Sequence, residues 1–273
     1  MLDVNEPSGA NPGDAEPWQS WPSFYFHRCN VASWAELRSV FQAIGRVDMV
    51  FANAGVGEPY DYFTHESLEE GAEPSYAGIM DVNVLGVMHT ITLARMSMRR
   101  FGVRDGSVVI TISAVAYAPE QSLPVYTASK FALVGLVRSL RSTMLLQEGI
   151  SINGVAPAAT ITNTLPPHLA APIIALGLPT SEAAFVGRAL VHAATARHDR
   201  RVEPYGKQTD ADKWPSGTGD ERERWNGRVI LTLGDTYTEL EEPIADLRPF
   251  WFGQENLRLT RAQQAATDFR KLS

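Results

Sequence analysis

Tyr126 and Lys130 stand four residues apart in the segment Tyr-Thr-Ala-Ser-Lys. On a helix this spacing puts both side chains on one face, within reach of each other. A free phenol has a pKa of about 10, and a nearby ammonium group favours the phenolate and lowers that pKa. We therefore expect Tyr126 to act as a general base towards an alcohol, or as a general acid towards a carbonyl group in the reverse direction.

Ser113 precedes this pair and follows a short apolar run. Its hydroxyl could hold a substrate oxygen through a hydrogen bond. A tyrosine–lysine pair alone is common on surface helices, and a serine at the end of a strand is usually a turn residue. Only the three residues together, in this order, indicate an active site.

Apolar runs alternate with helical patterns along most of the chain. Ser33 and Glu36 form a capping box, which predicts a helix start, and Gly45 ends that helix. The expected strands cover 24–28, 47–52, 107–112, 150–155 and 228–233, and the expected helices cover about 34–44, 74–100, 124–147, 181–197 and 260–271. This alternation predicts the α/β class: one domain over 1–273 with a doubly wound parallel sheet.

Three short motifs follow successive expected strands. They are Asn53-Ala54-Gly55, Ser113 and Pro157. Open α/β sheets bind ligands at the carboxyl ends of their strands, so these motifs are expected to share one site.

Four motifs together resemble the short-chain dehydrogenase/reductase family over about 24–233. They are Asn53-Ala54-Gly55, Asp81-Val82-Asn83-Val84, Ile112-Ser113-Ala114 and Tyr126-Thr127-Ala128-Ser129-Lys130. The thirteen positions from Ser113 to Tyr126 are typical of that family's catalytic spacing.

The resemblance implies a Rossmann-like fold and a role for each catalytic residue. Tyr126 would be the acid and base, and Ser113 would polarise the reacting oxygen. Lys130 would lower the pKa of Tyr126 and hold the ribose hydroxyls of a nicotinamide cofactor. Asn83 would anchor a water that relays the proton; the alternative is an amide inside a helix, satisfied by backbone.

The resemblance also implies a cofactor site that Tyr126 and Lys130 share. Asn53 and Gly55 would let the chain pass close to the cofactor, Asn30 and Val31 would contact its adenine ring, and Pro157 and Thr162 its carboxamide end. Thr162 is otherwise a plain helix cap. Asp3 would bind the adenosine ribose and favour NAD, with NADP as the alternative; otherwise it is an ordinary N-terminal residue.

The resemblance stops at the N-terminus. The family's opening strand carries a Thr-Gly-x-x-x-Gly-x-Gly turn for the pyrophosphate, and Gly9-Ala10-Asn11-Pro12-Gly13 lacks its spacing and has a proline where a helix should begin. If Asp3 occupies the family's position for the residue that binds the adenosine ribose, the sheet lacks the family's first strand. Either the sequence begins at an internal methionine of a longer active protein, or the short chain is the real product and is impaired.

Four segments stand outside the alternating pattern. Residues 1–23 read as irregular, 163–180 as a lid, 198–226 as a charged solvated loop, and 256–273 as a C-terminal helix. The apolar lid suggests a hydrophobic alcohol or ketone, such as a secondary metabolite; otherwise it packs on the body or on a partner subunit.

The composition of the chain limits the classes of partner and the compartment that we expect. Lys and Arg number 24 against 31 Asp and Glu, a net charge of −7, which disfavours nucleic acid and anionic membranes. The single cysteine, Cys29, fits a reducing compartment, and we expect a cytoplasmic homo-oligomer with no membrane span and no metal.

The leading hypothesis is an NAD(P)-dependent oxidoreductase that moves a hydride between the cofactor and a hydrophobic secondary alcohol or ketone. One alternative is a non-catalytic or impaired binding protein derived from this fold. Another is an epimerase or dehydratase with the same tyrosine–lysine chemistry.

Overall fold

The computed structural model describes all residues except 7–21, 59–61, 64–75, 199, 204–222 and 268–273. The irregular N-terminus expected over 1–23 therefore lies mostly outside the described residues, as does the segment from Gly9 to Gly13.

The main sheet has five strands in the order β11-β10-β5-β4-β3. All neighbours are parallel except β10 and β11. The strands are β3 (Met49–Ala52), β4 (Gly106–Thr111), β5 (Ile150–Pro157), β10 (Val229–Leu233) and β11 (Thr236–Glu239). The expected α/β class is confirmed, and the parallel register brings the carboxyl ends of β3, β4 and β5 to one edge.

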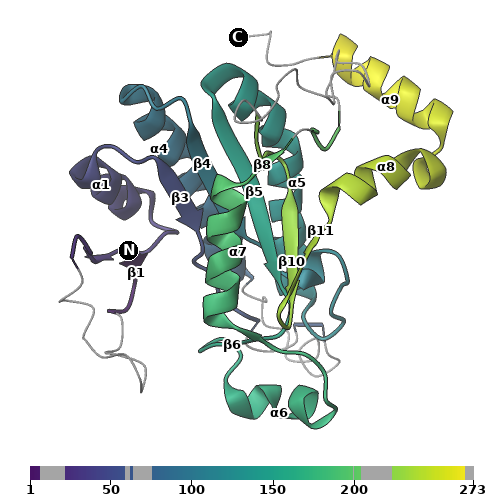
Figure 1. The fold of residues 1–273 in the computed structure, drawn as a ribbon. Coiled ribbons are helices and arrows are strands. Elements are labelled where there is room, and N and C mark those ends of the chain that lie inside the picture. The colour runs from purple at the N-terminus through teal and green to yellow at the C-terminus, as the bar shows by residue number, and fades with distance from the viewer. Residues whose placement is uncertain (7–21, 59–61, 64–75, 199, 204–222, 268–273) are drawn as a thin grey trace.

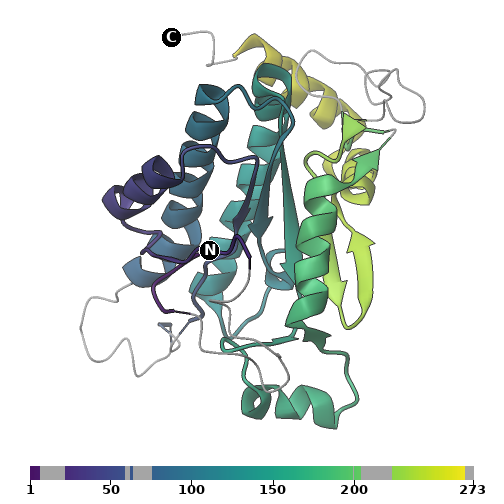
Figure 2. The same cartoon turned by 60° about the vertical axis from the view of Figure 1, so that its left-hand side comes forward.

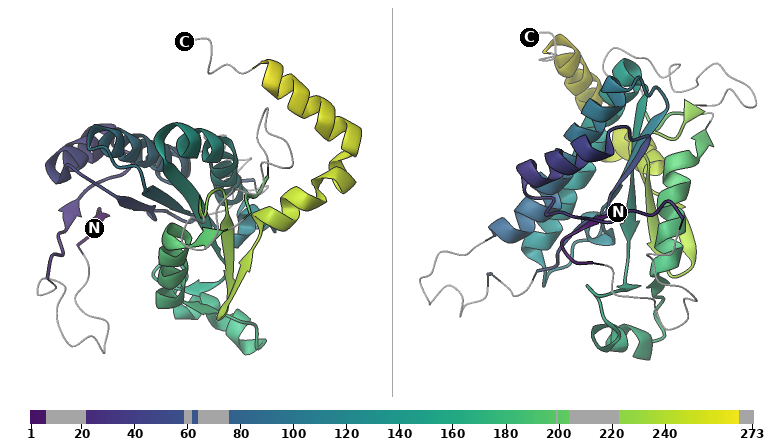
Figure 3. Two further views of the ribbon diagram at one scale, coloured as in Figure 1. Left: turned by 45° about the horizontal axis from the view of Figure 1, so that its top comes forward. Right: turned by 90° about the vertical axis from the view of Figure 1, so that its left-hand side faces the viewer.

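Helices cover both faces of this sheet, as Figures 1 and 3 show. Helices α1, α4 and α5 lie on one face, and α7 covers β4, β5 and β10 on the other. The helices are α1 (Trp34–Ile44), α3 (Ala77–Met80), α4 (Gly86–Arg100), α5 (Pro124–Thr143), α6 (Pro167–Ala175), α7 (Ala183–Thr195), α8 (Glu241–Phe252) and α9 (Gln254–Ala266). Separate apolar clusters fill the two sides.

Local signals explain where α1 begins and ends. The Ser33 hydroxyl accepts the N–H of Glu36, and Gly45 ends the helix with a φ of +76°. The second arm of the expected capping box is wrong, because the Glu36 carboxylate accepts the backbone N–H of Asn30 instead of that of Ser33. The first turn of the helix is thereby tied to Asn30, in the connection that follows β2.

The helix expected over 74–100 contains a turn that the pattern did not reveal. Between α3 and α4 the residues Asp81–Leu85 form a π-helical turn, with Asn83 in its middle. Such turns insert one extra residue and are frequent at functional sites. The combined helix Ala77–Arg100 is long and apolar enough to cross a membrane by length and composition, and 44% of its most apolar window is buried within the protein.

The first two strands form a separate parallel pair. These strands are β1 (Leu2–Asp3) and β2 (His27–Arg28), which is shorter than the strand expected over 24–28. A cavity of about 430 Å³ separates the pair from β3; Leu2 lines one wall and Phe51 another. Among the described residues no strand lies between β1 and β3.

The C-terminal region is more ordered than its pattern indicated. Gly234, with a φ of +60°, allows the tight turn that pairs β11 with β10. Helix α8 continues through Pro249 and ends at Phe252, and α9 begins at Gln254 rather than at 256 or 260.

The charged segment 198–226 is only partly a solvated loop. In its described part, β8 (Arg197–His198) pairs with β9 (Glu223–Arg224), and His198 and Val202 are buried. Ion pairs join the segment to α8, such as those of Arg200 with Glu242 and Asp246. Charge alone therefore gave the wrong expectation for these residues.

The lid segment 163–180 contains the short helix α6, at the lower end of the sheet in Figures 1 and 2. It follows β5 and β6 (Thr160–Ile161), and β7 (Ser181–Glu182) pairs with β6 beside it. Figure 2 shows α9 at the opposite end.

Candidate active site

Helix α5 places Tyr126 and Lys130 one turn apart. Pro124 starts the helix, and its fixed φ suits the first helical position. The Lys130 ammonium lies 5.5 Å from the centre of the Tyr126 ring. The side chains are therefore neighbours, as the four-residue spacing predicted.

Ser113 comes to the same place from the end of β4. Its backbone is extended, and its hydroxyl accepts the N–H of Val115 and hydrogen-bonds to the Tyr126 phenol. The hydroxyl also lies 3.5 Å from the carbonyl oxygen of Pro157 at the end of β5. Two adjacent strand ends and the start of α5 thus meet at Ser113.

Lys130 is buried, with 3% of its surface exposed. Its ammonium donates a hydrogen bond to the carbonyl oxygen of Thr111 at 3.0 Å. Burial lowers the pKa of Lys130 to about 8, because an apolar environment disfavours the charged form.

The net pKa shift of Tyr126 is opposite to the sequence expectation. Burial raises the pKa of Tyr126, and the hydrogen bond from Ser113 lowers it by less. Lys130 is not among the causes of this shift, so the expected lowering of the Tyr126 pKa by the ammonium is not found. In the protein alone, Tyr126 is therefore held as the neutral phenol.

Asn83 is fully buried, and its side chain is satisfied within the protein. Its Oδ1 accepts the Val56 N–H at 2.8 Å, and its Nδ2 donates to the Val56 carbonyl at 3.0 Å and to the Ser129 hydroxyl at 3.1 Å. Ser129 in turn donates to the carbonyl oxygen of Tyr126. Both amide hydrogens of Asn83 are used, so its side chain has none left to donate to a water.

Two of the expected cofactor residues lie beside this group. Asn53 accepts a hydrogen bond from the Thr111 hydroxyl at 2.7 Å. At Gly55 an added Cβ would lie 3.5 Å from the Lys130 ammonium and 3.4 Å from Asn83 Oδ1. The lack of a side chain at Gly55 therefore lets the backbone pass close to the ammonium of Lys130.

The other expected cofactor residues are spread along the same edge. Asp3 and Val31 line the cavity between β1 and β3, together with Asn53. The side chain of Asn30 accepts the Ala32 N–H and stabilises a turn.

Thr162 is not a helix cap, because α6 begins later, at Pro167. Its hydroxyl accepts the N–H groups of Thr164 and Leu165 and so closes a turn.

A nicotinamide cofactor fits one end of this arrangement. Lys130 has three ammonium protons and gives one to Thr111, which leaves two for ribose hydroxyls. Gly55 leaves room beside it, and Pro157 and Thr162 flank the same edge. The described residues contain no glycine-rich turn that would hold the diphosphate.

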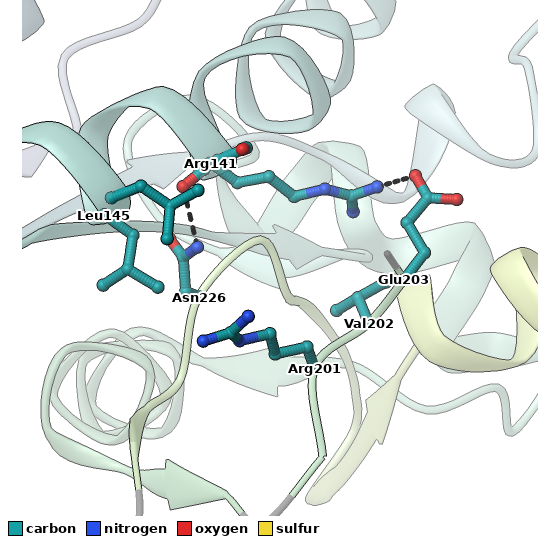
Figure 4. A pocket seen from close by; sticks show the side chains of 8 residues that line it. Arg141, Leu145, Arg201, Val202, Glu203 and Asn226 are labelled. Atoms are coloured by element: carbon teal, nitrogen blue, oxygen red, sulfur yellow. Dashed lines mark hydrogen bonds and ion pairs between the residues drawn. The ribbon is translucent and has the colours of Figure 1, made fainter. Parts of the chain in front are cut away.

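Two further findings concern a metal site and a second pocket. In the part of the chain that the structure describes, no three His, Cys, Asp or Glu side chains gather as metal ligands would. A pocket at the far end of α5, between Arg141, Glu203 and Asn226, has a volume of about 30 Å³ (Figure 4). It holds roughly one water molecule and lies about 22 Å along the helix from Tyr126, so it is not the reaction site.

Glu58 is a residue that the sequence analysis missed. Its carboxylate accepts the backbone N–H of Tyr126 at 2.9 Å. The two residues are 68 positions apart, and no local pattern links them.

Comparisons with known proteins agree with this geometry. The short chain dehydrogenase family pattern matches residues 15–170, more than half of the chain. Short-chain dehydrogenase/reductase prx4 of Penicillium roqueforti is 53% identical over 99% of this chain and 77% of its own length. ATR7 of Stachybotrys chlorohalonatus, with the same description, is 49% identical over 93% of this chain and 78% of its own.

A solved structure shares the fold. A short chain dehydrogenase/reductase family protein superposes with a TM-score of 0.51 and 23% identity, over 61% of this chain and 67% of its own. The chain therefore belongs to the short-chain dehydrogenase/reductase family of oxidoreductases, which act on small-molecule substrates.

Proposed function

We propose that this protein moves a hydride between a nicotinamide cofactor and a hydrophobic secondary alcohol or ketone. The observation that carries the proposal is the group formed by Ser113, Tyr126 and Lys130: a half-buried phenol hydrogen-bonded to a buried serine, with a buried ammonium 5.5 Å from its ring. Packing alone gives no reason to gather these three polar groups in one place.

The chain's own residues would handle the proton. Tyr126 would take the hydroxyl proton during oxidation and return it during reduction, and the Ser113 hydroxyl would hold the same oxygen. Since burial keeps Tyr126 protonated in the protein alone, reduction starts from the correct protonation state. When bound, the cofactor would supply or accept the hydride.

Lys130, Asn53, Gly55, Pro157 and Thr162 would hold the nicotinamide end of the cofactor. Asp3, Asn30 and Val31 would lie at its adenosine end. A carboxylate at position 3 favours NAD, because the 2′-phosphate of NADP would meet a negative charge.

The substrate class is inferred from the lid. Residues Leu169, Ile174 and Leu176 expose more than half of their surface on or just after α6. Apolar side chains at the mouth of a site favour a hydrophobic substrate, such as a secondary-metabolite alcohol or ketone.

Three broader expectations remain part of the proposal. The chain would be one domain, with 163–180 as lid and 256–273 as C-terminal helix. Exposed Met88, Met96 and Phe131 on α4 and α5 favour a homo-oligomer. The free thiol of Cys29 favours the cytoplasm.

A second candidate is a binding protein with impaired catalysis. One observation favours it: the described residues offer no backbone cradle for the diphosphate.

Thermal unfolding with NAD, NADP or neither decides between the two candidates. A cofactor at about 100 times its Kd adds about 2.7 kcal/mol of stability. We expect NAD to raise Tm more than NADP, and reduction of a panel of apolar ketones to follow. Tyr126→Phe should keep the Tm shift and lose turnover by roughly 100- to 10,000-fold. Indifference to both cofactors would favour the binding protein.

A further inference from the structure

Glu58 connects two segments that are far apart in the chain. Its Oε2 accepts the backbone N–H of Tyr126, while its Oε1 is buried and has no hydrogen-bond partner among the described residues. One oxygen of the carboxylate is therefore held by the start of α5, and the other is shielded from solvent.

The start of α5 lacks a cap of its own. The first N–H groups of a helix have no partner within the helix, and a polar N-cap side chain usually supplies one. Here the N-cap residue is Leu123, which makes no side-chain hydrogen bond, and Pro124 has no N–H. Glu58 supplies the missing acceptor, and a negative charge also suits the N-terminal end of the helix.

Residues 53–58 cross the whole candidate site, and we refer to them as the strap. Thr111 holds the strap at Asn53, and Asn83 holds it through two hydrogen bonds to Val56. Glu58 is the last anchor of the strap, and it is the one that reaches the backbone of Tyr126.

We propose that Glu58 is a positioning residue for Tyr126. Tyr126 is the third residue of α5, within the turn that frays most readily when a cap is lost. By fixing its N–H to the strap, Glu58 holds the phenol at one place relative to Ser113 and Lys130. Glu58 itself touches neither the phenol oxygen nor the substrate in this proposal, which rests on the proposed function only for its consequence in turnover.

The first test does not need a substrate. Tyr126 is replaced by 3-fluorotyrosine in the full chain, and its ¹⁹F resonance is recorded in the wild type, Glu58→Gln and Glu58→Met. The two substitutions have similar length, but only glutamine retains an acceptor. We expect one narrow resonance in the wild type and Glu58→Gln, and a broadened or split resonance in Glu58→Met. An unchanged resonance in Glu58→Met would overturn the proposal.

The second test uses turnover of whichever ketone the panel identifies. A small misplacement of a catalytic group costs up to about 100-fold in rate. We expect Glu58→Met to lower kcat by about 10- to 100-fold with little change in KM, and Glu58→Gln to restore most of it. Equal kcat in the two variants would overturn the proposal. If the wild type turns over no ketone, the proposed function fails while the ¹⁹F test still decides the role of Glu58.

Two further variants control for folding. Glu120 lies just before the same helix, and its carboxylate accepts hydrogen bonds within its own turn, from the N–H and the hydroxyl of Ser122. Glu120→Ala should leave both readouts unchanged. Glu58→Ala removes the acceptor without adding bulk, so it replaces Glu58→Met if far-UV circular dichroism shows that the methionine variant does not fold.

Discussion

Two regions of the molecule differ in how their strands are covered. We call β4 and β5, with the helix α5 that packs on them, the rigid half, and β3 with the nearby pair β1 and β2 the open half. Every residue of β4 and β5 is buried except Thr111 and Pro157 at the carboxyl ends, which are half-buried. In β3, by contrast, Met49 and Phe51 each expose 41% of their surface and line the cavity next to β1. The strands of both halves have the apolar composition of buried parallel strands. Only β4 and β5 are covered by neighbouring strands and helices on every side.

The difference separates the two tasks of the site. The proposed acid–base group of Ser113, Tyr126 and Lys130 lies on β4, β5 and α5, where packing and hydrogen bonds fix each side chain. The residues expected to contact the adenosine lie on or next to β1, β2 and β3, where an open cavity separates the pair β1 and β2 from β3. In the proposed function, the proton chemistry would therefore belong to the rigid half and the adenosine end of the cofactor to the open half.

The largest expected effect concerns a buried carboxylate in the rigid half. Glu241 exposes 1% of its surface and accepts hydrogen bonds from Tyr117 and from the guanidinium group of Arg138. Glu241→Ala leaves these partners uncompensated, so the free energy of unfolding in urea should fall by about 3–5 kcal/mol.

An ion pair in the open half serves as the matched control. Arg46 and Asp48 pair on the surface, with more than half of each side chain exposed. Asp48→Ala should leave the urea midpoint unchanged. A similar loss in both variants would contradict the contrast between the halves.

The next effect compares two apolar strand residues. Ile152 in β5 is fully buried, so Ile152→Ala should lower the free energy of unfolding by about 2–5 kcal/mol. Phe51→Ala in β3 removes more atoms, but they border the cavity, and about 1 kcal/mol or less is expected. Thermal and urea unfolding measure both. Equal losses would mean that β3 is covered in solution.

A pH effect of about 3 kcal/mol isolates Lys130. Its pKa falls from 10.5 to about 8 on burial, so the unfolded chain binds more protons than the folded one between those values. The wild type should therefore gain stability, relative to Lys130→Met, as the pH rises from about 8 to about 10.5. A constant difference between the two proteins across this range would show that Lys130 titrates normally.

The smallest expected effect is local and belongs to the open half. The Ser33 hydroxyl caps α1 through the N–H of Glu36. Ser33→Ala should cost about 1 kcal/mol, and Ser33→Asp should restore it. A much larger loss would mean that the position of α1 also holds β2 in place.

Local signals in the sequence were enough for the elements of the rigid half. The spacing of apolar residues predicted β4, α5 and β5, and the order of motifs predicted that Ser113, Tyr126 and Lys130 meet. Helix spacing and the parallel strand rule act over few residues, so they can be applied without a structure.

The residues missed are those whose partners are distant. Glu58 reaches Tyr126 across 68 positions, and Glu241 reaches Tyr117 across 124. The π-helical turn at Asn83 and the direction of the Tyr126 pKa shift also depend on contacts from other elements.

The sequence by itself therefore determined the fold class and the family, and it predicted the members of the proposed acid–base group, because these depend on residue type and local spacing. The tertiary structure decided which strands are covered, what caps α5, and how burial sets the protonation of Tyr126 and Lys130. Coverage and solvation are properties of the surroundings, and the surroundings of each of these residues come from segments that lie far away in the chain.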